Sequence, residues 1–112
     1  MHKYQKAKNA YYEALNGINV KENEKIVLKC KTIWCYSFAA NIPGADIKAH
    51  EKVILESKDP EYSYYFAKYI PGANIEEHFK VILNSGNKVW LFSFIERVNY
   101  KGTKVEEWLF YI

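Results

Sequence analysis

The residues of this sequence that could do chemistry are two cysteines, two regularly spaced histidines and scattered serines. Four residues separate Cys30 from Cys35, whereas zinc sites and thioredoxin-like redox sites usually place two residues between their cysteines. In a reducing compartment we expect both thiols to stay reduced and to pack as small hydrophobic groups. The cysteines therefore predict structural positions in the core.

His50 and His78 lie 28 residues apart, each in a segment that is typical of a second helix in a helix pair. A metal site would need further ligands, such as Glu51 or Glu77, because zinc usually takes four. A shared polar seam is the functional alternative. We favour an ordinary position at the edge of an apolar stripe, and we expect neither a metal nor a cofactor.

No catalytic arrangement is recognisable in the sequence. The serines fall at repeated positions without a nucleophile motif, and no phosphate-binding loop is present. Most carboxylates stand where helix caps or charged helix faces are expected. We therefore expect that the protein is not an enzyme.

A repeat carries these side chains, since Phe38, Phe66 and Phe94 are each 28 residues apart. The same step links three further sets, namely Trp34, Tyr62 and Trp90; Tyr36, Tyr64 and Phe92; and Ile42, Ile70 and Val98. A weaker first unit steps by 27 residues. We expect one domain built of repeat units at about residues 1–31, 32–58, 59–86 and 87–112.

Each unit is predicted to be a pair of short helices. Asp59-Pro60 is typical of a helix start, and Pro71-Gly72 is typical of a helix stop. Two predicted capping boxes mark second helices: Asn74 with Glu77, and Asn19 with Glu22. The pattern predicts an all-α, α-solenoid-like stack of about eight short helices, in which each pair covers its neighbour.

One alternative concerns the C-terminal segment, at about residues 89–112. Apolar residues alternate at Trp90, Phe92 and Phe94, and again at Trp108, Phe110 and Ile112. Strict alternation around a turn favours a β-hairpin. The repeat instead favours a helix pair there, and the sequence leaves both structures open.

The units FAANIPGADI and FAKYIPGANI resemble a short helical repeat of uncharacterised phage and bacterial proteins, in which Phe-Ala is followed by Gly-Ala-Asp/Asn-Ile/Val. The resemblance covers about residues 32–98. It implies a helical scaffold of mobile-element origin, and it transfers no catalytic residue. A phage inhibitor or adaptor that acts on a host complex is the most concrete function that it implies.

Tyrosines supply the clearest candidate binding surface. Tyr65 and Tyr69 fall at repeat positions that hold serine, asparagine or arginine in other units, so we expect them at the surface. An exposed tyrosine buries much area at little entropic cost, which favours a protein partner. The expected partner-binding residues are Tyr65, Lys68, Tyr69, Arg97, Trp108 and Phe110. The last two belong to an apolar end that predicts homodimerisation or partner docking.

Nucleic-acid binding is the second function that the sequence suggests. Residues 1–31 hold seven lysines and three glutamates. Lys3, Lys6 and Lys8 lie opposite Tyr4, Ala7, Tyr11 and Leu15 on a predicted helix; a solvated face explains them, and weak contact with nucleic acid is the alternative. Arg97 is the sole arginine, although arginine is the usual reader of base edges.

The composition indicates a folded, cytoplasmic protein without a membrane segment. Hydrophobic residues make up 49% of the chain and aromatic residues 17%, which favours a core rich in rings. No apolar run approaches the roughly 18 residues of a membrane helix. The first residues lack the apolar stretch of a secretory signal.

Overall fold

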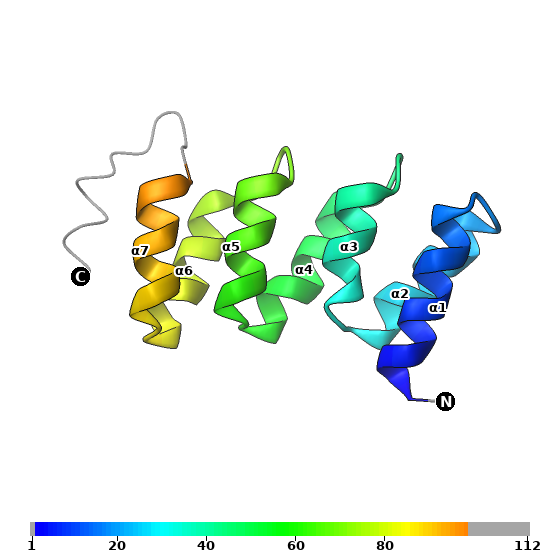
Figure 1. The fold of residues 1–112 in the computed structure, drawn as a ribbon, viewed down its shortest axis with the longest axis horizontal. Coiled ribbons are helices and arrows are strands. Elements are labelled where there is room, and N and C mark those ends of the chain that lie inside the picture. Colours follow the sequence, from blue (N-terminus) through cyan, green and yellow to red (C-terminus); the bar gives the residue numbers. More distant parts are fainter. Residues whose placement is uncertain (1, 99–112) are drawn as a thin grey trace. The chain divides into compact units, whose positions relative to one another are not determined.

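A computed structural model describes residues 2–98 of the chain. The chain divides into two compact units, Met1–Ser57 and Lys58–Ile112. All regular elements among the described residues are α-helices (Figure 1). The division falls one residue before the predicted boundary between the second and third repeat units. None of the described helices is long and apolar enough to cross a membrane.

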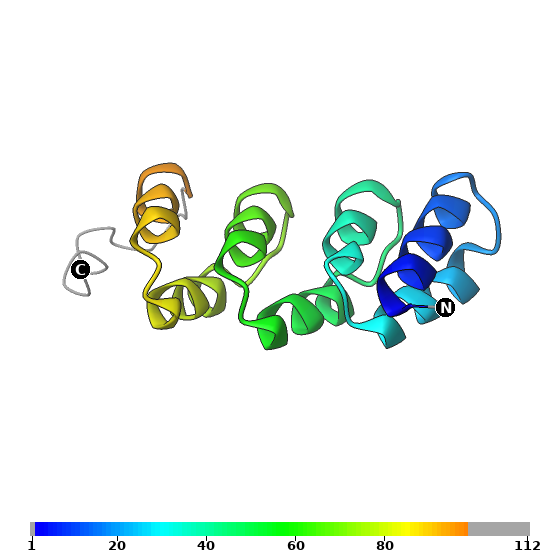
Figure 2. The same cartoon turned by 60° about the horizontal axis from the view of Figure 1, so that its bottom comes forward.

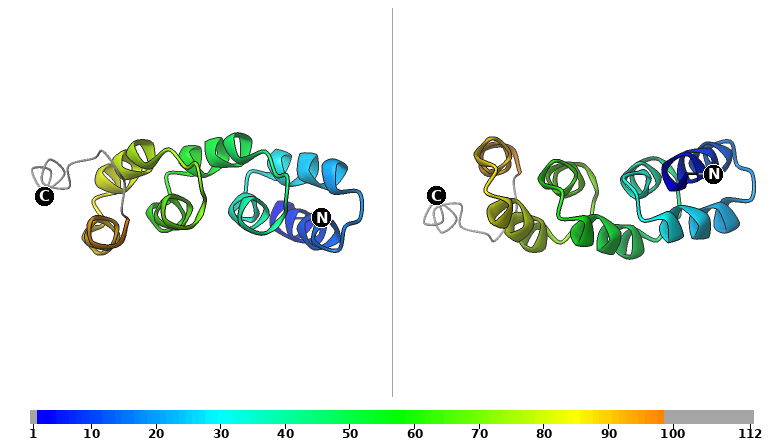
Figure 3. Two further views of the ribbon diagram at one scale, coloured as in Figure 1. Left: turned by 90° about the horizontal axis from the view of Figure 1, so that it is seen from above. Right: turned by 90° about the horizontal axis from the view of Figure 1, so that it is seen from below.

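The first unit contains four helices: α1 (Lys3–Leu15), α2 (Val20–Cys30), α3 (Trp34–Asn41) and α4 (Ile47–Ser57). Helices α1 and α3 pack side by side in one layer, and α2 and α4 form a second layer (Figure 3). Each helix therefore contacts its partner in the hairpin and also the corresponding helix of the next hairpin. This is the packing predicted for adjacent helix pairs.

The second unit contains three described helices: α5 (Pro60–Tyr69), α6 (Ile75–Ser85) and α7 (Lys88–Arg97). Helices α5 and α7 lie side by side, and α6 packs against both (Figure 2). The alternative prediction of a β-hairpin at 89–112 is thus wrong for its first strand, because α7 occupies that segment. Residues 99–112 lie outside the described part of the chain.

The apolar residues at 88–97 fit both the two-residue period of a strand and the period of about 3.6 residues of a helix, and the buried ones follow the helical period. Trp90, Phe92 and Phe94 alternate, but Leu91, Phe94 and Val98 also recur at helical spacing, and all three are buried. The Asn87 side chain accepts a hydrogen bond from the Trp90 N–H at 3.2 Å and caps the helix. A capped helical face therefore decides the structure of this segment.

Side-chain caps start several of the helices as predicted. Asp59 Oδ1 accepts from the N–H groups of Glu61 and Tyr62 at 2.9 and 3.4 Å, with Pro60 opening α5. Asn74 Oδ1 accepts from the Glu77 N–H at 3.3 Å, so the cap of α6 is confirmed.

The predicted capping box of Asn19 with Glu22 is wrong. Asn19 has a left-handed backbone (φ 42°, ψ 50°) and makes no side-chain cap hydrogen bond. An N-cap side chain reaches the helix N–H groups from an extended backbone, which Asn19 lacks. Glu22 instead pairs with Lys25 at 3.5 Å on the exposed face of α2.

The cores of the two units use the same repeat positions. Phe38, Phe66 and Phe94 are each completely buried. Ile54 and Ile82 are also buried, and they lie on the second helices, α4 and α6. In the second unit the buried cluster comprises Tyr64, Ala67, Phe79, Ile82, Leu91, Phe94 and Val98. The repeated Phe position of the first helices and the repeated Ile position of the second helices are therefore core packing positions.

Candidate functional site

The structure brings Tyr65, Lys68 and Tyr69 together on α5, where spacings of three and four residues place them on one face. We call these three residues the α5 surface. Tyr69 has 56% of its surface exposed, Lys68 is exposed, and Tyr65 is half-buried. The expectation of surface positions is therefore confirmed for Tyr69, whereas Tyr65 also takes part in packing.

Aromatic neighbours hold Tyr65 in one orientation. Its ring centroid lies 5.7 Å from that of Trp90 on α7, with the planes at 80°, and 6.4 Å from that of Tyr69. Its hydroxyl donates to Glu61 Oε2 at 3.1 Å. Edge-to-face packing and a hydrogen bond both restrict the side chain. The more exposed Tyr69 thus stands beside a ring that is already ordered.

Lys68 places a cation among these rings. Its Nζ atom lies 5.1 Å from the ring centroid of Tyr69 and 5.7 Å from that of Tyr64, within the range of cation–π attraction. Hydrogen bonding to Tyr64, and then to Tyr69, raises the pKa of Lys68 above its ordinary value. The α5 surface therefore combines aromatic area with a permanent positive charge.

Arg97 is the last residue of α7, as Tyr69 is the last residue of α5. The two helices pack together and run in the same direction (Figure 1). Arg97 is exposed and adds a second cation at the matching end of α7. Trp108 and Phe110, the other expected partner-binding residues, lie outside the described residues, and their role stays a prediction.

His50 forms a buried polar link between α2 and α4. Its Nε2 atom lies 2.9 Å from Glu24 Oε2, which also accepts the Asp46 N–H at 2.8 Å. The imidazole stacks on Phe38 with ring centroids 5.0 Å apart. Burial lowers the pKa of His50, and the hydrogen bond and charge of Glu24 oppose that shift. This geometry serves structure, since no part of the ring reaches solvent.

The expectation that His50 and His78 lie at the edge of an apolar stripe is wrong. Both side chains are completely buried. His78 stacks on Phe66 at 5.2 Å, in the same way as His50 stacks on Phe38. Among residues 2–98 no group of three or more His, Cys, Asp or Glu side chains could hold a metal ion. The histidines therefore occupy the centre of the packing, where a repeated Phe provides a flat ring.

The two cysteines are buried and free, as predicted. The Cys35 thiol lies 3.7 Å from the Val27 carbonyl oxygen. Burial raises the pKa of Cys35 to about 12, so the group is a protonated thiol at neutral pH. A nucleophilic cysteine needs a lowered pKa, which Cys35 does not have.

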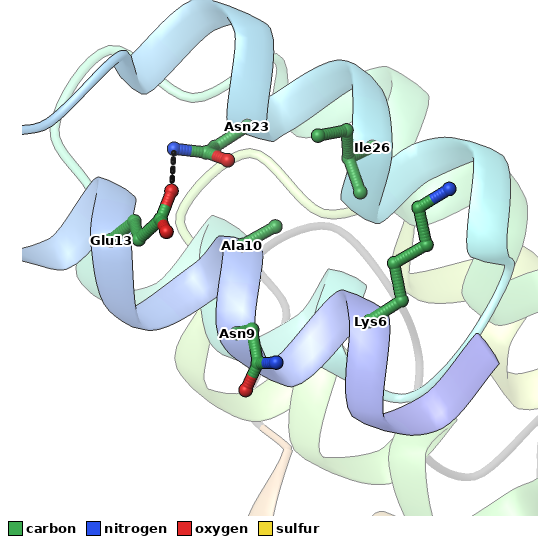
Figure 4. Close-up of a pocket in the computed structure, with 6 residues that line it drawn as sticks. All are labelled: Lys6, Asn9, Ala10, Glu13, Asn23 and Ile26. Carbon is green, nitrogen blue, oxygen red and sulfur yellow. Dashed lines mark hydrogen bonds between the residues drawn. The ribbon is translucent and has the colours of Figure 1, made fainter. Parts of the chain in front are cut away.

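The structure does not place Lys3, Lys6 and Lys8 on one face of α1. Lys6 and Lys8 are two residues apart, which separates their side chains by about 160° around a helix. Lys6 lines a groove of about 360 Å³ between α1 and α2 (Figure 4). The other groove residues are Asn9, Ala10, Glu13, Asn23 and Ile26. A continuous basic stripe is therefore absent from α1.

Sequence reasoning missed a second exposed aromatic region, on α1. Tyr4 and Tyr12 are 43% and 47% exposed, and both rings pack against Trp34 of α3. The spacing of eight residues between the two tyrosines places them about 80° apart around the helix. Tyr4 shares the side opposite the lysines with Ala7 and Tyr11, but only Ala7 and Tyr11 are buried.

The comparisons with known proteins leave the functional argument to these side chains. No protein-family model, curated protein or solved structure matches the chain. The resemblance of its repeat to phage and bacterial sequences stays a prediction. The α5 surface is the strongest candidate site, because its exposed aromatic group lies against both a second tyrosine ring and a lysine of the same helix.

Proposed function

We propose that this chain is a non-catalytic protein-binding module of the helical-repeat, α-solenoid-like class, whose partner docks on the α5 surface. One observation carries the proposal: Tyr69 is 56% exposed, and its ring lies 5.1 Å from the Lys68 Nζ atom and 6.4 Å from the Tyr65 ring. An exposed and ordered tyrosine offers contact area at a low entropic cost. Residues of this kind dominate the energetics of protein interfaces.

The chemistry of the surface favours a protein over a nucleic acid. Tyr65 and Tyr69 supply apolar area with hydroxyl groups at the rim, whereas binding to a nucleic acid gains most of its affinity from clustered cations. Lys68 and Arg97 are the cations of this region, and Arg97 is the sole arginine of the chain. A partner with an acidic or polar rim around an apolar centre fits this arrangement.

The more specific form of the proposal follows from the resemblance of the repeat. A module of mobile-element origin would act as an inhibitor or adaptor by binding a host protein complex. Such a role needs a surface and no chemistry of its own. The α5 surface meets that requirement. An experiment must identify the host complex.

The repeat itself provides the variant that tests the α5 surface. Replacing Tyr65 by Ser, Lys68 by Ala and Tyr69 by Asn gives α5 the letters that α3 carries at the equivalent positions (Ser37, Ala40 and Asn41). The exposed Glu76, on α6, supplies a matched control as Glu76→Gln. Wild type, surface variant and control are used as baits, and each captured protein is then purified and titrated against all three.

We expect the surface variant to weaken binding of the purified partner by at least about tenfold, while Glu76→Gln binds as the wild type does. Circular dichroism checks that the variant is folded. A partner that binds all three baits with the same affinity would show that the α5 surface is not the interface. A captured nucleic acid with steep salt dependence would favour the second function instead.

The predicted homodimer is a separate part of the proposal. Helix α7 exposes Val89 (71%) and Phe92 (46%), two large apolar side chains in the last described helix. Light scattering at high protein concentration is expected to give the mass of a dimer, and Phe92→Ser to shift the mass towards that of one chain. A wild-type mass of one chain at every concentration would remove the homodimer.

A further inference from the structure

Helix α1 presents an exposed apolar stripe that the α5 surface does not explain. Tyr4, Tyr12 and Leu15 have 43%, 47% and 46% of their surfaces exposed. Together with Lys8 they follow the spacing of four, four and three residues that forms one face of a helix. We call these four residues the α1 stripe. A different face of α1 packs against the rest of the unit, through the buried residues Ala7, Ala10, Tyr11 and Ala14.

The two tyrosines of the α1 stripe are held in place by α3. Trp34 lies 5.7 Å from Tyr4 and 5.9 Å from Tyr12, measured between ring centroids. The ring centroid of Tyr11 lies 5.4 Å from that of the same Trp34. The Tyr11 hydroxyl accepts a hydrogen bond from Asn41 Nδ2 of α3 at 3.0 Å, which fixes the cluster further. The stripe is therefore a preorganised surface, which lowers the entropic cost of binding.

The charge of the α1 stripe has one sign. Lys8 is its only charged residue, and it is half-buried. Glu13, the only carboxylate of α1, lies on the groove side and accepts from Asn23 Nδ2 of α2 at 3.2 Å (Figure 4). The first turn of α1 contains no acidic residue, so the positive end of the helix dipole is not offset there.

We propose that the α1 stripe binds an acidic amphipathic helix of another protein. Its apolar residues have the spacing that accepts the apolar face of a helix, and its positive charge complements carboxylates beside that face. A second copy of this chain would oppose Lys8 with another Lys8, so charge disfavours it. This inference is independent of the α5 surface, because the two surfaces belong to different units.

A synthetic peptide tests the proposal with a defined probe. The probe is a labelled peptide of about 18 residues, long enough for a marginal helix, with Leu at helical spacing and Glu at most other positions. A matched peptide carries Lys in place of Glu. Fluorescence anisotropy measures binding, and the NMR signal of the Trp34 indole N–H, assigned with Trp34→Phe, reports whether the peptide docks beside Tyr4 and Tyr12.

We expect the acidic peptide to bind and to shift the Trp34 signal, and the basic peptide to do neither. Tyr12→Ala and Lys8→Glu should each weaken binding of the acidic peptide by about tenfold, or about 1.4 kcal/mol. Lys6→Glu is the matched control, since it makes the same charge change on the groove side of α1. It should weaken binding at most about twofold.

Three outcomes would overturn the proposal. They are no binding of the acidic peptide by folded wild-type protein, equal binding of the basic peptide, and equal losses in Lys8→Glu and Lys6→Glu. A single-stranded oligonucleotide that shifts the Trp34 signal where the acidic peptide does not would assign the stripe to nucleic acid. The variant of the α5 surface should bind the acidic peptide as wild type does, which separates this test from that of the proposed function.

Discussion

The cores of the two units contain the same stacked pair of a phenylalanine and a histidine. In the first unit Phe38 stacks on His50 at 5.0 Å, and in the second Phe66 stacks on His78 at 5.2 Å. All four side chains are completely buried. Outside this shared core the units differ, since each surrounds its tryptophan with different tyrosines. The comparison teaches that repetition preserves the interior, while function is to be sought where the copies disagree.

The surfaces show the difference. Trp34 packs against Tyr4, Tyr11 and Tyr12 of α1, which leaves an exposed stripe on that helix. Trp90, at the equivalent repeat position, packs against Tyr64 and Tyr65 of α5. In the second unit a lysine also lies against the tyrosine rings. The same tryptophan position therefore supports two different exposed surfaces.

The largest expected effect removes the shared core. Phe38→Ala and Phe66→Ala should each lower the free energy of unfolding by about 3–5 kcal/mol, because both rings are completely buried and leave a cavity. Urea denaturation followed by circular dichroism measures this loss. The exposed Ile18, which belongs to none of the proposed surfaces, is the control, and Ile18→Ala should cost under about 1 kcal/mol. A small loss in only one of the two core variants would break the equivalence of the units.

The next effect concerns the polar link of the first unit. Glu24→Ala removes the acceptor of the buried His50 and of the Asp46 N–H, and should cost about 1–3 kcal/mol of unfolding free energy. Lys25→Ala, on the neighbouring exposed position, should change it by at most about 0.5 kcal/mol. Equal urea midpoints for the two variants would show that the link contributes nothing.

A smaller effect should appear as pH dependence. Burial holds the pKa of His50 below the ordinary 6.5, so the unfolded chain binds a proton there before the folded chain does. Stability from this group is therefore complete above pH 6.5 and is lost as the pH falls from 6.5 towards the lower folded pKa. His50→Gln, which keeps a donor for Glu24, should flatten the fall in urea midpoint. An unchanged pH slope in His50→Gln would contradict the assignment.

The smallest effect compares the ends of second helices. Lys31, Lys58 and Gly86 follow α2, α4 and α6, and all have positive φ angles, of 52°, 57° and 72°. Lys58→Gly should therefore stabilise the protein by about 0.5–1 kcal/mol, and Gly86→Ala should destabilise it by about 1 kcal/mol. Thermal unfolding measures both changes. A destabilised Lys58→Gly would show that the lysine side chain contributes more than the backbone strain costs.

Much of the fold could be predicted from local chemistry. The caps Asp59 and Asn74 and the stop signal Pro71-Gly72 act within a few residues, so they are visible in a single sequence. Asn19 failed as a cap because its left-handed backbone depends on the α1–α2 turn. The alternation of apolar residues at 90–94 is compatible with a strand. Only the tertiary packing shows that Leu91, Phe94 and Val98 form the buried face of a helix.

The candidate site could be predicted only in part. Comparison of repeat copies identified Tyr65 and Tyr69, because a position that holds serine or asparagine in another unit is expected at the surface. The packing of Tyr65 on Trp90 of α7 is tertiary, and that comparison does not reveal it. The polar partner of the buried His50 is Glu24, which lies 26 residues away in the sequence, and no local pattern identifies a partner at that separation. The α1 stripe was missed because the weak first unit hides which side of α1 meets α3.

Site-specific photo-crosslinking tests the central claim, that the positions at which the copies differ are the binding positions. A photoreactive phenylalanine analogue is placed at position 69, in α5, and at the equivalent position 41, in α3, of the full chain. The account predicts one dominant crosslinked protein from position 69 and none from position 41. The same products from both positions, or none from position 69 in folded protein, would contradict it.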